Sequence, residues 1–263
     1  MVEFYYKLSR LQMEKIDKES TLVVIPLGAV EQHGNQAPVG TDTLIAEEIS
    51  KRVSEKLRGN ELFKIDKNVL FFPVIPVGYS VEHLSFCGSI SFRPETYYNV
   101  LTDICESLHR HGFENIAFLI CHGGNRAMVE IVSRQVRRDI GSKVYLIGCG
   151  AFLNPNVKAT ITPGNEADFH GGEMETAMVM AIDESMVDLS VSEKGTYSLS
   201  KPGSKLNFFG NLALPWMGED FITDSQKPIG IGGDPSGATS EKGEIILEES
   251  ANEIVEGILS IFM

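Results

Sequence analysis

The sequence has few cysteines and no long apolar run. Its four cysteines, Cys87, Cys105, Cys121 and Cys149, form no CxxC pair, which argues against a zinc site built from thiolates. Free thiols suit a reducing compartment. No apolar stretch approaches the roughly 18 residues that a membrane span needs, and the first residues lack the apolar core of a secretory signal. We therefore expect a cytoplasmic protein without a membrane partner.

Positive charge is also scarce. The chain carries 23 Lys and Arg residues against 36 Asp and Glu residues, and its formal net charge is -13. An acidic surface repels phosphates, so a nucleic-acid partner is not expected. Hydrophobic residues make up 43% of the 263 residues, which is enough for a substantial core. The length suits one domain, and we expect a single domain over residues 1–263.

Short apolar runs alternate with helical patterns along the chain. The runs are apolar throughout, as expected for strands that are covered on both faces; they span residues 22–27, 69–77, 116–121 and 144–149. The predicted helices span residues 42–57, 95–111, 125–139, 171–183 and 239–262. This order predicts an α/β protein, a single layered α/β/α domain with a mostly parallel sheet. We expect loops and short strands over residues 184–237, near the site or at a subunit contact.

Histidines and acidic residues follow the predicted strands. The first strand ends in EQHG (residues 31–34), the third ends in CHGGN (121–125), and HGGEMET (170–176) follows the fourth. The carboxyl ends of parallel strands share one edge of the sheet, where ligands bind. Alternate residues of an extended segment share a face, so Glu31 and His33 can point into one pocket. Asp42 opens the next helix and can turn back toward them.

His122 and Glu173 would add an imidazole and a carboxylate to these three residues. Three carboxylates and two imidazoles exceed the three protein ligands of a usual catalytic zinc. They suit a pair of divalent ions about 3.5–4 Å apart, and ligation by oxygen and nitrogen fits Zn, Mn, Fe or Co. The alternative is a polar loop with a hydrogen-bonded core histidine.

Two further histidines are candidate catalytic residues. His83 follows the second strand and either orients a metal-bound water or is a hydrogen-bonded loop residue. His170 either donates a proton to a leaving group or caps the helix that follows it. Cys121 could be a nucleophile, but neighbouring residues of a strand face opposite ways, so with His122 in the pocket Cys121 is expected in the core.

Several segments resemble the signatures of the creatininase (creatinine amidohydrolase) family, in the family's order. They are PLGAVEQHGNQAPVGTDTLIA, VGYSVEHLSFCGSIS, CHGGN and HGGEMET, and GDPSGATSEKG (residues 233–243) resembles the family's C-terminal block. The resemblance implies a layered α/β fold, a homo-oligomer that is often a hexamer, and two divalent metal ions (Zn, Mn or Fe). It implies as metal ligands Glu31, His33, Asp42, His122 and Glu173, with Asp42 bridging.

The chain departs from creatininase itself in two places. Creatininase carries an acidic ligand two residues after the histidine of the third motif, where this chain has Gly124, and Glu173 resembles the substitute used by other members. Trp216 is the only tryptophan, whereas creatininase closes tryptophans over its substrate.

The function expected from these features is metal-dependent hydrolysis of a small polar, cyclic substrate. A metal-bound hydroxide would attack a carbonyl and break a C–N bond, with His170 or a water protonating the leaving atom. The alternatives are hydrolysis of a C–C bond in a cyclic diketone derived from inositol, deformylation of a pyrimidine precursor, and a non-catalytic small-molecule binding module.

Overall fold

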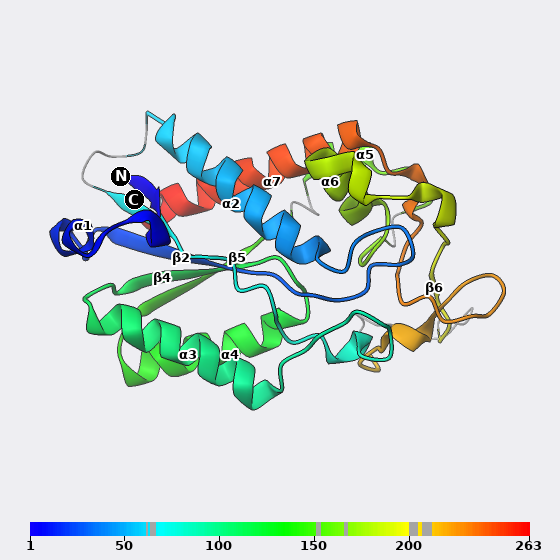
Figure 1. Cartoon of the computed structure of the whole chain (residues 1–263), viewed down its shortest axis with the longest axis horizontal. Helices are drawn as coiled ribbons and strands as arrows, with labels where there is room; N and C mark the ends of the chain where they lie inside the picture. Colours follow the sequence, from blue (N-terminus) through cyan, green and yellow to red (C-terminus); the bar gives the residue numbers. More distant parts are fainter. Residues whose placement is uncertain (62, 64–66, 151–153, 166–167, 200–204, 207–211) are drawn as a thin grey trace.

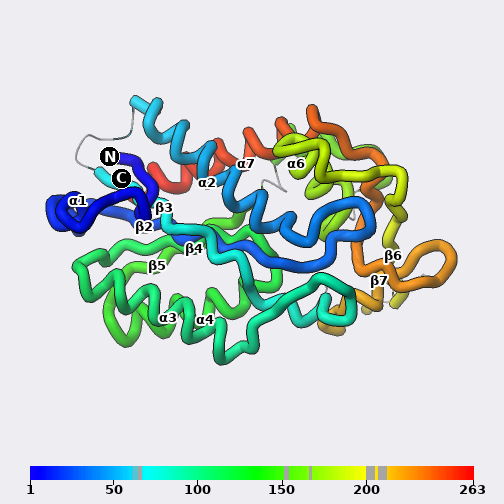
Figure 2. The backbone as a smooth tube through the Cα atoms, in the orientation of Figure 1, coloured from blue at the N-terminus to red at the C-terminus, as the bar shows by residue number. Residues whose placement is uncertain are grey.

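A five-stranded parallel sheet forms the centre of the molecule, with strand order β1-β3-β2-β4-β5 (Figures 1 and 2). The strands are β1 (Val2–Phe4), β2 (Thr21–Leu27), β3 (Asn68–Phe71), β4 (Asn115–Ile120) and β5 (Lys143–Gly148). The structure is a computed structural model, and it describes all residues except 62, 64–66, 151–153, 166–167, 200–204 and 207–211.

Helices cover both faces of this sheet. On one side lie α2 (Thr41–Arg58), α6 (Glu173–Asp183) and α7 (Ser240–Ile261), and on the other lie α3 (Pro94–Arg110) and α4 (Asn125–Asp139), as Figure 1 shows. Two short helices, α1 (Arg10–Lys15) and α5 (Pro155–Thr160), complete the set that the structure describes. The prediction of a layered α/β/α fold with a mostly parallel sheet is confirmed.

The central strand β2 supplies both halves of the core. Its residues are buried from end to end, and they alternate between the two faces. Leu22 and Val24 pack with the residues of α2 and α7, while Val23 and Ile25 pack with those of α3 and α4. A strand covered on both faces needs an apolar residue at every position, which explains the uninterrupted run TLVVIPL.

Two strands differ from their predicted form. The run 69–77 predicts one long strand, but β3 ends at Phe71, because Pro73 and Pro76 have no backbone N–H to continue a ladder. Strand β5 is an edge strand and is not covered on both faces, so Leu146 is 41% exposed.

The segment 184–237 contains short elements, as expected, in the part that the structure describes. Strands β6 (Thr196–Tyr197) and β7 (Phe221–Ile222) pair antiparallel. Short 3-10 helices along the chain lie at Tyr5–Lys7, Val81–His83, Glu184–Met186, Leu189–Val191, Gly218–Asp220 and Pro235–Gly237. Among the described helices, we find none with the length and apolar character needed to cross a membrane.

Candidate active site

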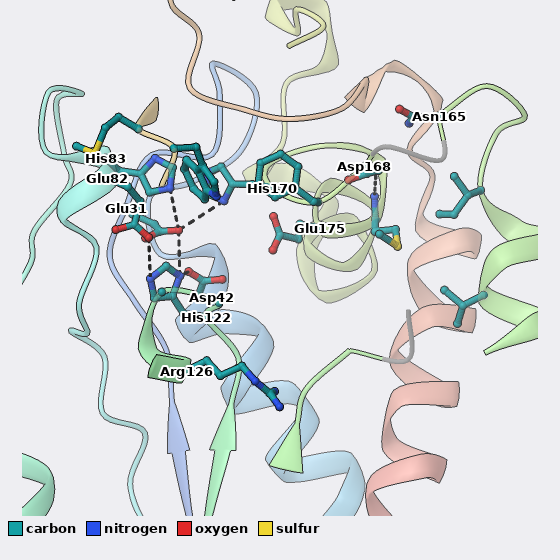
Figure 3. A pocket seen from close by; sticks show the side chains of 18 of the residues that line it. Glu31, Asp42, Glu82, His83, His122, Arg126, Asn165, Asp168, His170 and Glu175 are labelled. Carbon is teal, nitrogen blue, oxygen red and sulfur yellow. Dashed lines mark hydrogen bonds and ion pairs between the residues drawn. The ribbon is translucent and has the colours of Figure 1, made fainter. Parts of the chain in front are cut away.

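The segments that follow β2, β3 and β4 meet the beginning of α6 at the carboxyl edge of the sheet (Figure 3). Together they line a cavity of about 1160 Å³. One side of the cavity carries Glu31, Asp42, His122, His170 and Glu175, and the remaining wall is largely apolar. This is the edge at which ligands bind in open parallel sheets.

Two carboxylates and one imidazole form the first part of the cluster. His122 Nδ1 lies 3.2 Å from Glu31 Oε1 and 3.4 Å from Asp42 Oδ2. Glu31 follows β2, Asp42 lies in the first turn of α2, and His122 follows β4. Three separate elements therefore bring these atoms together, and all three side chains are buried.

His33 forms the second part with two other carboxylates. Its Nε2 lies 3.7 Å from Asp42 Oδ1 and 3.5 Å from Glu175 Oε2. Glu175 comes from the first turn of α6 and accepts a hydrogen bond from the Gly171 backbone N–H at 2.6 Å. Asp42 thus presents one oxygen to His122 and the other to His33, which is the arrangement of a carboxylate that bridges two cations.

Three histidines direct one ring nitrogen into the cluster. In each, the other ring nitrogen lies next to a backbone carbonyl: His33 Nδ1 is 3.0 Å from Glu31 O, His122 Nε2 is 3.0 Å from Tyr79 O, and His170 Nε2 is 2.9 Å from Gln32 O. A carbonyl only accepts, so these nitrogens donate, and the opposite nitrogen of each ring is the one that can bind a cation once it is deprotonated. Metal-binding histidines usually have such a donor contact.

Several buried polar atoms of the cluster have no hydrogen-bond partner among the described residues. They are both carboxylate oxygens of Glu31, Oδ2 of Asp42, Nε2 of His33 and Nε2 of His83. Buried polar atoms without partners are rare and need an explanation. Divalent cations would satisfy the oxygens of Glu31 and Asp42 and the nitrogen of His33, so these residues fit a metal site without sulfur ligands.

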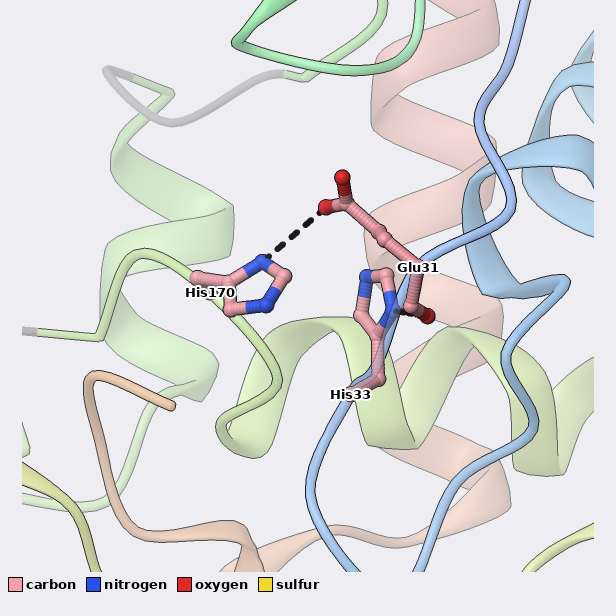
Figure 4. Close-up of side chains that lie close together, drawn as sticks. All are labelled: Glu31, His33 and His170. Atoms are coloured by element: carbon pink, nitrogen blue, oxygen red, sulfur yellow. Dashed lines mark hydrogen bonds and ion pairs between the residues drawn. The ribbon is translucent and has the colours of Figure 1, made fainter. Parts of the chain in front are cut away.

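The possible ligand atoms fall into three groups, each with its atoms within 4.8 Å of one another. The groups are Glu31–Asp42–His122, His33–Asp42–Glu175 and Glu31–His33–His170. The first two share Asp42, which fits two cations side by side. Figure 4 shows the third, in which Glu31 and His33 face His170.

The close packing of charges shifts the pKa values of the histidines in opposite directions. Burial alone would lower the pKa of His33, but the carboxylates of Asp42 and Glu175 raise it to about 10. Burial also opposes a charge on His122, yet Glu31 and Asp42 raise its pKa well above the ordinary value. Burial, with other histidines nearby, lowers the pKa of His170 well below its ordinary value, so that ring is neutral at pH 7.

Metal binding is expected to release protons. Without metal, His33 and His122 hold a second ring proton at pH 7 because their pKa values lie above 7, and a cation must displace it. Affinity should therefore rise with pH, by up to about tenfold per pH unit for each proton displaced. Calorimetric titration with Zn²⁺ in buffers of different ionisation enthalpy measures the protons released. A binding heat that is the same in every buffer would contradict this expectation.

His83 is the last residue of the 3-10 helix Val81–His83 and lies beside the cluster. Its Nε2 is 3.6 Å from Glu31 Oε1, and Gln32 Nε2 donates to its Nδ1 at 3.0 Å. Burial lowers the pKa of His83 to about 4, so the ring is neutral, with its Nε2–H directed at Glu31. The His83 ring stacks on the His170 ring with centroids 4.2 Å apart, and the centroid of the Trp216 ring lies 5.4 Å from that of His83.

The structure does not bring Glu173, the fifth predicted ligand, into the cluster. Its carboxylate accepts hydrogen bonds from Thr162, Asn165 and Lys242, on another side of α6. Residues two apart on a helix point about 200° away from each other, so Glu173 and Glu175 cannot both face the cluster. Glu175 occupies the place that the sequence interpretation gave to Glu173.

Gly124 stands where creatininase carries an acidic ligand, and a glycine supplies no carboxylate. A side chain at this position would begin 2.4 Å from His122 Nε2 and 2.6 Å from both Glu82 Oε1 and Tyr79 O. Because the Tyr79 oxygen belongs to the backbone, a side chain at position 124 would require that segment to shift, and in this structure the remaining carboxylate comes from α6.

Two residues of the site were missed from the sequence, Glu175 and Gln32. Glu175 lies in the motif HGGEMET, in which the family resemblance points to its neighbour Glu173 instead. Gln32 links the site because its amide N–H groups reach His83 and the Gly230 carbonyl, the latter at 2.6 Å. Cys121 packs against the core as predicted, and burial raises its thiol pKa well above the ordinary value, which makes it a poor nucleophile.

Comparison with known proteins agrees with this geometry. The family model for creatininase, described as creatinine amidohydrolase, matches residues 6–258. A mycofactocin precursor peptide peptidase of Mycobacterium ulcerans (strain Agy99) is 29% identical over 236 residues, covering 90% of this chain and 84% of the relative. A creatinine amidohydrolase of Pseudomonas putida is 26% identical over 185 residues, covering 64% of this chain and 66% of the relative.

The fold is also similar to that of solved creatininase structures. The solved structure named "Creatininase Mn" superposes with a TM-score of 0.77 at 23% identity, and the match covers 98% of both chains. The family match over nearly the whole chain, together with a cluster that fits divalent cations, shows that this protein belongs to the creatininase family of metal-dependent hydrolases.

Proposed function

We propose that the protein hydrolyses the C–N bond of an amide in a peptide-like substrate, with two divalent cations at the carboxyl edge of the sheet. The observation that carries this proposal is the set of unpartnered oxygens of Glu31 and Asp42 at one side of a large cavity, together with the unpartnered Nε2 of His33 next to Asp42. Glu31, Asp42 and His122 would hold one cation, and His33, Asp42 and Glu175 the other.

When bound, such cations lower the pKa of a water and stabilise the charge that develops on a carbonyl oxygen. The protein's own residues carry the proton from the water to the leaving group. His170 is neutral and keeps its Nε2–H on the Gln32 carbonyl, so its Nδ1, 3.5 Å from Glu31 Oε1, carries the lone pair that would take a proton from water. The same nitrogen then gives the proton to the leaving amide nitrogen, which needs it to depart as an amine.

His83 and Trp216 act beside this proton carrier. The Nε2–H of His83 points toward Glu31 Oε1 at 3.6 Å, too far for a hydrogen bond, and attracts the carboxylate toward it. Trp216 lines the cavity beside the stacked pair of His83 and His170, with its ring centroid 5.4 Å and 6.4 Å from theirs. His83 is thus a positioning residue, whereas His170 meets the reacting atoms.

The size of the cavity favours a peptide over a small ring. Pockets for drug-sized ligands occupy about 300–1000 Å³, and this cavity, at about 1160 Å³, exceeds that range. Tyr79, Phe169 and Met217 belong to its apolar lining, which suits apolar side chains. A peptidase is also among the relatives with high coverage of this chain.

A small cyclic amide is the second candidate. The family description and the Pseudomonas relative both name creatinine amidohydrolase, whose reaction also breaks a C–N bond. The same ligand set and the same proton carrier serve both candidates, so the wall of the cavity decides between them.

A substrate panel with and without chelator tests the proposal. The panel contains short peptides with apolar side chains, creatinine, a formamide and a cyclic diketone. We expect peptide cleavage that falls at least about a thousandfold after chelation and returns with Mn²⁺ or Zn²⁺, because a cation contributes several kcal/mol to the transition state. Cleavage that chelator leaves unchanged would contradict the metal mechanism, and turnover of creatinine alone would favour the second candidate.

A further inference from the structure

Glu173 is a fully buried carboxylate that the proposed chemistry does not use. Its oxygens accept from the Thr162 backbone N–H at 3.1 and 3.2 Å, from the Thr162 hydroxyl at 2.8 Å and from the Asn165 amide at 2.9 Å. Lys242 Nζ also donates to it, and this lysine is only 24% exposed. These donors come from segments that lie far apart in the sequence, so the Glu173 carboxylate links them through hydrogen bonds.

The contact joins three parts of the chain. Thr162 and Asn165 follow α5, Glu173 is the first residue of α6, and Lys242 lies in the first turn of α7. Lys242 also donates to the Gly237 carbonyl at 2.8 Å, and Asn165 exchanges two hydrogen bonds with the Asp234 backbone, at 2.9 and 3.0 Å. The segment GDPSGATSEKG, which the proposed chemistry leaves without a role, therefore supplies half of this contact.

The backbone at Gly237 packs directly against the hydrogen bonds between Thr162 and Glu173. A side chain at Gly237 would begin 2.6 Å from the Thr162 hydroxyl oxygen and 3.1 Å from the Glu173 carboxyl group. A side chain at position 237 would therefore displace the Thr162 hydroxyl or the Glu173 carboxylate from the hydrogen bond between them.

The residues held in this way form part of the cavity wall. Ile161, Thr162, Pro163 and Asn165 line the cavity, together with Val157 and Lys158 of α5. In Figure 3, Asn165 lies on the opposite side of the view from Glu31 and His122, with Glu175 between them. The wall is therefore separate from the ligand cluster, although Glu173 and Glu175 share one helical turn.

We propose that Glu173, with Lys242, is a positioning residue that fixes the cavity wall formed by residues 161–163 and 165, and so sets how tightly a substrate that fills the cavity binds. This inference rests on the proposed function in one respect, namely that the substrate occupies the cavity. The wall itself can be tested without turnover.

Hydrogen exchange of the whole protein tests the wall. In Glu173→Gln and in Lys242→Met, amides of residues 155–165 should exchange at least about tenfold faster than in the parent protein, because several buried hydrogen bonds are lost. Amides of α3 serve as the internal control. Lys242→Met changes a partly exposed residue and provides a second variant should Glu173→Gln fold poorly. Unchanged exchange at residues 155–165 would overturn the proposal.

Ligand binding tests the consequence for substrate. Acetohydroxamate reaches only a metal centre, whereas a peptidyl hydroxamate also fills the cavity. In both variants we expect the dissociation constant of the peptidyl probe to rise about tenfold and that of acetohydroxamate to stay within about twofold. Metal content per chain should equal that of the parent protein, and loss of metal in Glu173→Gln would overturn the positioning role in favour of a ligand role.

The two proposals fail in different ways. If the parent protein binds neither hydroxamate but exchange at residues 155–165 responds as expected, the positioning of the wall stands and the proposed function fails. If the peptidyl probe loses no affinity in variants whose wall exchanges faster, the link between the wall and substrate binding is overturned while the metal centre stands.

Discussion

Asp42→Asn is expected to abolish hydrolysis and the paired metal site together. Asp42 Oδ2 lies 3.4 Å from His122 Nδ1, and Asp42 Oδ1 lies 3.7 Å from His33 Nε2. Asp42 is thus the residue shared by the two proposed cation sites, Glu31–Asp42–His122 and His33–Asp42–Glu175. An amide keeps the size of the carboxylate but loses the charge and one of the two acceptor oxygens. Because a bound cation contributes several kcal/mol to the transition state, turnover should fall at least about a thousandfold.

The measurements are metal per chain by mass spectrometry, turnover, and circular dichroism for the fold. Asp103→Asn provides a matched control, because Asp103 is an exposed aspartate on α3, a helix without cavity-lining residues. The control should keep the parent protein's metal content and activity. Unchanged metal content and turnover in Asp42→Asn would refute the bridging role.

The main helices could be predicted because their ends carry local signals. Pro94 stands at the beginning of α3, and Thr239 caps α7 by accepting from the Lys242 backbone N–H. The apolar strands β2 and β4 were equally clear. The edge strand β1 was missed because it has only three residues, and α1 and α5 were missed because their six residues span less than two helical turns and show no periodic pattern.

The cluster could be predicted in part from strand ends. Glu31, His33, Asp42 and His122 come together because parallel strands deliver their following residues to one edge. Which glutamate of α6 joins them depends on the rotation of the helix about its axis. Gly171 and Gly172 precede the helix and leave that rotation open, and contacts from Thr162, Asn165 and Lys242, distant in the sequence, decide it.

Tertiary contacts also decide which ring nitrogen of each histidine carries the proton, and the sequence alone does not show this. Whether His170 donates or accepts depends on the Gln32 carbonyl, 138 residues away in the chain. The homo-oligomer implied by the family resemblance stays a prediction, because it depends on surfaces that meet other subunits.

Glu175→Gln is expected to remove one cation and leave the other. Glu175 Oε2 lies 3.5 Å from His33 Nε2 and belongs only to the group His33–Asp42–Glu175, so Glu31, Asp42 and His122 keep their own cation. Metal content should fall from about two ions per chain to about one, and turnover at least about a hundredfold, because a single cation no longer clamps both reacting oxygens.

Glu173→Gln is the matched control for this change. It alters the same residue type in the same turn of α6, but its carboxylate meets Lys242 and Thr162 instead of His33. The pair therefore separates a ligand from a residue that positions the wall, with overall charge and helix composition held equal. Glu175→Gln should lose metal and Glu173→Gln should keep it; the reverse result would restore Glu173 as the ligand and require α6 to be rotated about its axis.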